Sequence, residues 1–202
     1  AQGFCRRKII ERNMREEKRR KRTEMTTVAM LTAISCMLVF IYLPFPLFPA
    51  FKYELADVPV LIATFAFGPV PGIIVTVLAA FVQAFVLGQD TWMGFTMHVI
   101  ATGTFAVIAG IIYHRNKSRK TAVIGLACGT VGMAVVMCVA NYVLDPIFYG
   151  MTREAVAKLV LPAILPFNLS KAGVNSIVTF LIYKKISNII HGSKKRNEYE
   201  RD

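Results

Sequence analysis

The sequence predicts an all-α membrane protein with six transmembrane helices and both termini on the cytoplasmic side. Apolar residues make up 55% of the 202 residues and fall into long runs, as in proteins that cross a bilayer several times. The charges lie between these runs: ten of the 24 Lys and Arg precede residue 23, four lie between residues 115 and 120, and six lie at or after residue 184. Because the net charge of +12 is confined mainly to the tails and one loop, it indicates membrane orientation, and we predict no nucleic-acid partner.

The charge distribution divides the chain into three parts. Residues 1–25 form a basic cytoplasmic arm without an apolar core, which is not typical of a simple cleavable signal peptide and is expected to touch anionic lipid. Residues 26–187 form the six-helix transmembrane domain, and residues 188–202 form a basic cytoplasmic tail.

The first apolar run covers residues 26–43 and ends at two prolines. The second covers residues 58–88, which as one helix would measure about 46 Å against a hydrocarbon core of about 30 Å. A Gly-Pro-Val-Pro-Gly sequence at residues 68–72 interrupts it, so this run is either one kinked helix or two spans joined by a tight turn. The later apolar runs cover residues 93–113, 121–144 and 161–183.

Charge decides between one span and two in the second run. By the positive-inside rule, both the basic arm and the basic loop at residues 114–120 belong in the cytoplasm, so an even number of spans separates them. Residues 26–43 and 93–113 supply two spans, and residues 58–88 must supply two more, although 58–67 is short for a span. The last two runs go out and return to the basic tail, which gives six spans.

Three polar residues, Asn168, Lys171 and Asn175, share one face of the sixth predicted span because they lie three and seven residues apart. A lysine at the centre of a membrane helix costs about 2.5–3.5 kcal/mol, so it needs a buried partner or ligand unless it snorkels to the interface. The asparagines could also bond to neighbouring helices. For Asn175, the deepest of the three, we expect such a helix–helix contact.

Other polar side chains gather toward the outer ends of the predicted spans. Asn141 and Asp145 lie near the outer end of the fifth span, and Gln83 lies within the third. Amides, an ammonium group and aromatic rings at a common depth suit a neutral, planar, hydrogen-bonding solute, with the proline- and aromatic-rich first outer connection as a lid. That connection, residues 44–59, supplies three polar candidates: Tyr53, Glu54 and Asp57.

Structural roles compete with ligand contact at two of these positions. Asp57 stands where the second span begins, so its carboxylate could instead cap that helix. Asn141 could instead form a hydrogen bond between helices.

The sequence contains no pattern typical of a metal site or an enzyme. Its cysteines, Cys5, Cys36, Cys128 and Cys138, have no CxxC spacing. Within these 202 residues there is no GxxxxGK[ST], HExxH or GxSxG sequence. We therefore predict no metal, no catalytic residues and no ATP hydrolysis by the Walker route.

The first span carries a face of small residues. Ala29 and Ala33 lie four residues apart, and Met37 follows one turn later. A small-xxx-small face allows close approach of another helix, which can belong either to an external partner or to the same chain.

Two stretches of the chain resemble a known family. Residues 52–75 carry an Asp-x-Pro sequence followed by a Gly-Pro-x-x-Gly turn, and residues 166–185 carry the Asn168-x-x-Lys171 pair. They resemble the riboflavin-specific substrate-binding subunit, or S component, of energy-coupling factor (ECF) transporters. The resemblance extends over roughly residues 25–188, and the family's six helices and cytoplasmic termini agree with the charge argument.

The resemblance implies a function in vitamin uptake and not in catalysis. Such a subunit captures riboflavin, a transported ligand and not a cofactor, from outside a bacterial-type plasma membrane, with the first outer loop as a gate. It releases riboflavin inward when a transmembrane coupling subunit and two ATPase subunits drive it. The residues implied to contact the ligand are Asn141, Asn168, Lys171, Tyr53, Glu54 and Asp57, and those implied to dock on the coupling subunit are Ala29 and Ala33.

Two other interpretations stay open at this point. The protein could be an S component for another vitamin or planar solute. It could also be a small structural or enzymatic membrane protein that uses Lys171 catalytically or as an anchor.

Overall fold

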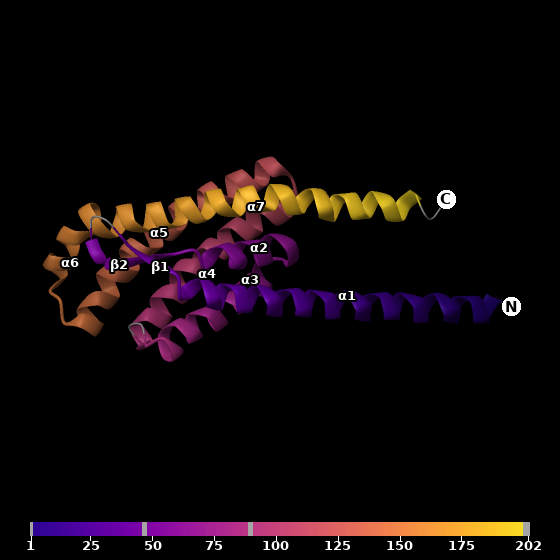
Figure 1. The fold of residues 1–202 in the computed structure, drawn as a ribbon, viewed down its shortest axis with the longest axis horizontal. Helices are drawn as coiled ribbons and strands as arrows, with labels where there is room; N and C mark the ends of the chain where they lie inside the picture. Colours follow the sequence, from indigo (N-terminus) through magenta and orange to yellow (C-terminus); the bar gives the residue numbers. More distant parts are fainter. Residues whose placement is uncertain (1, 46–47, 89–90, 200–202) are drawn as a thin grey trace.

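A computed structural model describes residues 2–45, 48–88 and 91–199 as a bundle of helices with a small hairpin at one end (Figure 1). The last three residues of the predicted tail, 200–202, lie outside the described residues. In chain order the elements are α1 (Gln2–Val39), β1 (Tyr42–Phe45), β2 (Phe48–Glu54), α2 (Asp57–Phe67), α3 (Pro69–Phe81), the π-helical segment η1 (Val82–Val86), α4 (Thr91–Arg115), α5 (Arg119–Tyr149), α6 (Arg153–Leu159), the π-helical segment η2 (Val160–Ile164) and α7 (Leu165–Tyr199).

The first and last helices extend beyond the bundle in the same direction, opposite the hairpin and α6 (Figure 1). Helix α1 continues without a break from the basic arm into the first apolar run, and α7 continues past the predicted span into the tail. Two chain ends on the same side are what an even number of membrane passes requires.

Four helical stretches in the described part of the chain are long and apolar enough to cross a membrane. They support the prediction of a helical membrane protein, although α2 is a shorter apolar helix of 11 residues. The four stretches are Pro69–Val86, Thr91–Arg115, Arg119–Tyr149 and Arg153–Tyr183.

The second apolar run forms two helices, because Gly68 ends α2 and Pro69 begins α3. Gly68 has a φ of 116°, a conformation that side chains with a Cβ rarely adopt. The two helices approach closely at Gly72, where an added Cβ would collide with the hydroxyl of Thr64. Proline and glycine therefore permit both the break and the tight packing that follows it.

The segment between α1 and α2, which was predicted as the first outer connection, contains an antiparallel hairpin that the all-α prediction did not include. Tyr42 pairs with Glu54 and Leu43 with Tyr53 along strands β1 and β2. Prolines exclude a helix interior here, and the aromatic residues between them favour extended backbone. This hairpin matters for the site because its last residue is Glu54.

Helix α5 is longer at its C-terminal end than predicted. It starts after Ser118, whose side chain and that of Thr121 form a capping box, and it ends at the left-handed Gly150. The helix therefore continues through Pro146, which lies inside its final turn. Asp145, which was predicted to lie near the end of the fifth span, is buried within α5.

Candidate binding cavity

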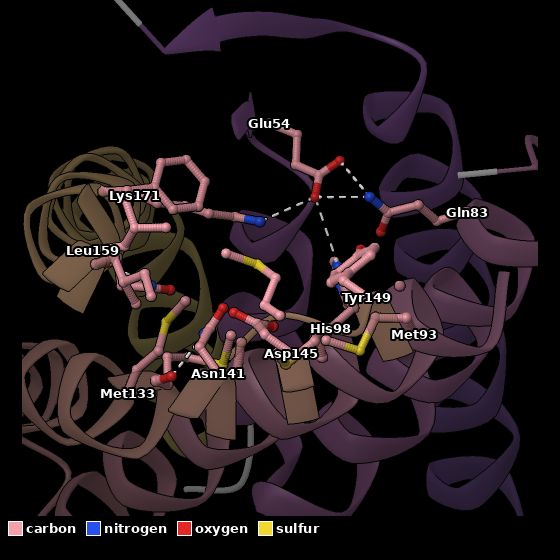
Figure 2. Close-up of a pocket in the computed structure, with 18 residues that line it drawn as sticks. Glu54, Gln83, Met93, His98, Met133, Asn141, Asp145, Tyr149, Leu159 and Lys171 are labelled. Carbon is pink, nitrogen blue, oxygen red and sulfur yellow. Dashed lines mark hydrogen bonds and ion pairs between the residues drawn. The ribbon is translucent and has the colours of Figure 1, made fainter. Parts of the chain in front are cut away.

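A cavity of about 500 Å³ lies beside Glu54, the last residue of the hairpin, and among helices α4, α5 and α7 (Figure 2). This volume is within the range of sites that hold small organic ligands. Its walls combine a few polar groups with apolar side chains, among them five methionines. The lining residues are Glu54, Gln83, Met93, Gly94, Met97, His98, Ala101, Met133, Met137, Asn141, Asp145, Tyr149, Met151, Leu159, Ile164, Phe167, Asn168 and Lys171.

Lys171 is 8% exposed and forms an ion pair with Glu54, its Nζ donating to Oε1 at 3.0 Å. Gln83 from η1 also donates to the Glu54 carboxylate, with Nε2 at 3.0 Å from both oxygens. The hairpin is thus joined to α7 and η1 through one carboxylate (Figure 2). The snorkelling interpretation of Lys171 is wrong, because its charge turns inward to a buried partner.

The surroundings of Glu54 favour its ionised form. Burial by itself raises the pKa of this carboxyl. The charges of Lys171 and His98, with the hydrogen bonds from Lys171 and Gln83, outweigh burial and hold the pKa of Glu54 below its ordinary value. At neutral pH the pair is therefore a charged one.

Asp57 lies behind the cavity wall and not in it. Its side chain is fully buried and accepts hydrogen bonds from Thr102 Oγ1 at 2.6 Å and Asn175 Nδ2 at 3.0 Å. The capping interpretation of Asp57 is wrong, because its side chain caps no backbone N–H of α2 and Ala56 occupies the N-cap position. Asn175 makes the helix–helix contact predicted for it.

His98 on α4 lies between the two carboxylates. Its Nδ1 is 3.6 Å from Glu54 Oε1, and its Nε2 is 3.8 Å from Asp57 Oδ1. No group of residues suited to a metal occurs in the described part of the chain. A single histidine in an apolar run gives no spacing signal, so its carboxylate partners could not be inferred.

Asn141 and Asn168 face the cavity from α5 and α7. Each donates one amide hydrogen bond to its own helix, Asn141 to the Met137 carbonyl at 2.7 Å and Asn168 to the Ile164 carbonyl at 2.8 Å. Each amide therefore keeps its oxygen and a second N–H for a ligand. Asn141 makes no hydrogen bond to another helix in the described residues, so that interpretation is wrong.

Tyr53 precedes Glu54 in the hairpin but does not line the cavity. Its hydroxyl is buried without a hydrogen-bond partner among the described residues. Burial, with the nearby Asp57 charge, raises the pKa of Tyr53 to about 12, so the phenol is neutral. The roles of Tyr53 and Asp57 as ligand contacts stay predictions.

The family described as "ECF transporter, substrate-specific component" matches residues 23–183. The chain belongs to this family. Its members are components of transporters, which confirms the prediction that the protein is not an enzyme.

Relatives similar to this S component share one named function. It is 33% identical to the riboflavin transporter RibU of Staphylococcus aureus, over 88% of this chain and 95% of the relative. It is 30% identical to the riboflavin transporter FmnP of Bacillus subtilis, over 81% of this chain and 91% of the relative. A solved structure of the S component of a bacterial ECF transporter matches with a TM-score of 0.74 and 34% identity, over 84% of this chain and 98% of that one.

Helix α1 of this S component leaves its small-residue face on the surface. Ala29 and Ala33 are exposed, whereas Ser35 on another face is buried and donates to the Ala56 carbonyl at 2.7 Å. The interpretation that the alanines serve packing within the chain is therefore wrong for the described residues. Exposed apolar neighbours continue the same surface: Met30, Ile34 and Met37.

Proposed function

We propose that this protein is the riboflavin-binding S component of a vitamin uptake transporter. It captures riboflavin from outside and releases it inward when a transmembrane coupling subunit and two ATPase subunits act on it. The observation that carries the proposal is a cavity of about 500 Å³ with amide, ammonium and methionine groups, in a chain 33% identical to a riboflavin transporter.

The two kinds of cavity wall correspond to the two parts of the flavin ring. The pyrimidine edge of an isoalloxazine carries carbonyl acceptors and an N–H donor, which Asn141, Asn168 and Lys171 can satisfy. The dimethylbenzene end is apolar and suits the methionines, whose sulfur atoms contact aromatic rings favourably. Binding needs only these non-covalent contacts, so no nucleophile or general base takes part.

The hairpin contributes to the site through Glu54. This carboxylate fixes the position of the Lys171 ammonium and can also accept a hydrogen bond from a ligand hydroxyl. Asp57 and Tyr53 act from behind the cavity, Asp57 by orienting Asn175 and Thr102. A hairpin held to the helices by a few polar contacts at Glu54, from Lys171, Gln83 and Asn175, is a suitable gate for a site that must open to admit its ligand.

The topology that we propose has six spans, with α2 as a short second span and both termini in the cytoplasm.

The exposed Ala29 and Ala33 face of α1 is the proposed contact with the coupling subunit, since small residues let helices approach closely in a membrane. Within these 202 residues no Walker sequence occurs, which is why ATP hydrolysis is assigned to other subunits.

Binding to the purified protein tests the proposal. We expect protein purified in detergent to carry a yellow flavin chromophore, or after its removal to quench riboflavin fluorescence at sub-micromolar concentration. Biotin and thiamine serve as control vitamins that should not compete. A colourless protein that binds no riboflavin, or one that prefers another planar solute, would contradict the proposal.

A further inference from the structure

Asp145 is a carboxylate of the cavity with no part in the riboflavin contacts proposed for Asn141, Asn168 and Lys171. It lies on α5 one turn beyond Asn141, lines the cavity and is 9% exposed. Figure 2 shows it with Asn141 on the wall opposite Glu54. Among the described residues it has neither a hydrogen bond nor an ion pair, whereas Glu54 and Asp57 each have several polar neighbours.

The basic groups of the cavity, Lys171 and His98, already have carboxylate partners other than Asp145. Lys171 pairs with Glu54, and His98 lies between Glu54 and Asp57. Within the described lining residues, no cation is left to neutralise Asp145 or to bind an anionic ligand group. A buried charge without a partner is unfavourable, so a ligand with hydroxyl or N–H donors gains by satisfying it.

The same carboxylate repels a negatively charged ligand. A phosphate bound in the part of the cavity lined by Asn141, Asp145 and Tyr149 lies close to the Asp145 carboxylate, and like charges at such short range repel. A phosphate monoester carries close to two negative charges at neutral pH. Riboflavin and flavin mononucleotide share the ring and the ribityl chain and differ by that phosphate.

We propose that Asp145 is a specificity-determining residue that makes the cavity select uncharged riboflavin over phosphorylated flavin. The proposal rests on the proposed function. In this role the carboxylate accepts a hydrogen bond from a donor of the neutral ligand and excludes the anionic one. Replacing it should therefore change the relative affinities of the two flavins, and not merely weaken both.

Fluorescence titration of the purified full-length protein with riboflavin and with flavin mononucleotide tests this. In the wild type we expect weaker binding of flavin mononucleotide. In Asp145→Asn we expect the ratio of the two dissociation constants to move toward flavin mononucleotide by about tenfold, since the amide keeps the size and loses the charge. Glu154→Gln is the matched control, because it removes an exposed carboxylate of α6 that does not line the cavity, and its ratio should equal that of the wild type.

The titrations separate a failure of the role proposed for Asp145 from a failure of the proposed riboflavin binding. Equal affinities in the wild type, or a ratio in Asp145→Asn within twofold of the wild type, would overturn the role of Asp145 while leaving riboflavin binding intact. Asp145→Ser provides a second neutral variant if the asparagine protein does not fold. A wild-type protein that binds neither flavin would instead overturn the proposed function, and this inference with it.

Discussion

At the scale of single residues, the buried pair of Lys171 and Glu54 organises the candidate site. The ammonium lies in a helix where an uncompensated charge is costly, and the carboxylate comes from a hairpin 117 positions earlier in the chain. The spacing of Asn168, Lys171 and Asn175 predicts that they share one helix face, because this depends only on their positions within a single helix. The pairing with Glu54 depends on how distant segments pack, and no sequence period encodes it.

Removing the Lys171 charge should affect both binding and stability. We expect Lys171→Ala to weaken riboflavin binding about tenfold or more and to destabilise the protein by about 3 kcal/mol, because Glu54 is left buried without its partner. Adding Glu54→Gln should restore much of the thermal stability without restoring the affinity.

Thermal unfolding and riboflavin titration on the same preparations separate these two effects. Lys158→Ala, which removes an exposed lysine of α6, is the control and should change neither. Wild-type affinity in Lys171→Ala would show that this face is structural and does not contact the ligand.

At the scale of elements, the break between α2 and α3 illustrates what the sequence predicts well. Gly68 and Pro69 act through local backbone geometry, so the position of the break could be predicted from these two residues. The β1–β2 hairpin was missed because prolines and aromatic residues indicate only that the segment is not helical. The pairing of the two strands depends on how the hairpin packs against one end of the helix bundle, which residues distant in the sequence determine.

The close approach of α2 and α3 should make Gly72 intolerant of a side chain. Gly72→Ala places a methyl group against Thr64, whose hydroxyl is already bonded to the Val60 carbonyl at 2.8 Å, and we expect a loss of about 1–3 kcal/mol. Gly103→Ala on α4 is the matched control, because an added Cβ there meets nothing within 4 Å. Thermal unfolding in detergent would contradict this packing if Gly72→Ala were as stable as Gly103→Ala.

The small-residue face of α1 should matter for transport but not for binding. We expect Ala29→Leu or Ala33→Leu to leave the riboflavin dissociation constant unchanged and to abolish uptake in cells, because close helix approach is lost. Ala127→Leu, at another exposed alanine on α5, should spare both properties. Uptake by the α1 variants equal to that of the wild type would argue against docking on this face.

At the scale of the whole molecule, the distribution of charge sets the proposed orientation. Basic residues gather in the arm, the loop before α5 and the tail, and the hairpin and α6 lie at the opposite end of the bundle (Figure 1). This orientation places the mouth of the cavity on the outer side.

Cysteine labelling in intact cells tests the orientation. In a chain whose native cysteines are replaced by serine, Thr152→Cys before α6 should react with a membrane-impermeant maleimide, and Ser118→Cys before α5 should react only after the cells are broken. Labelling of Ser118→Cys in intact cells would show that the loop before α5 lies outside. The topology would then be the reverse of the proposed one, and capture of riboflavin from outside would be contradicted.

The central claim is that the cavity binds riboflavin through Asn141, Asn168 and Lys171, and a riboflavin-bound structure tests it most directly. We expect the polar edge of the flavin ring to lie within hydrogen-bonding distance of these three side chains, with its apolar end among the methionines. A flavin bound outside this cavity, or bound in it with no contact to any of the three, would contradict the account.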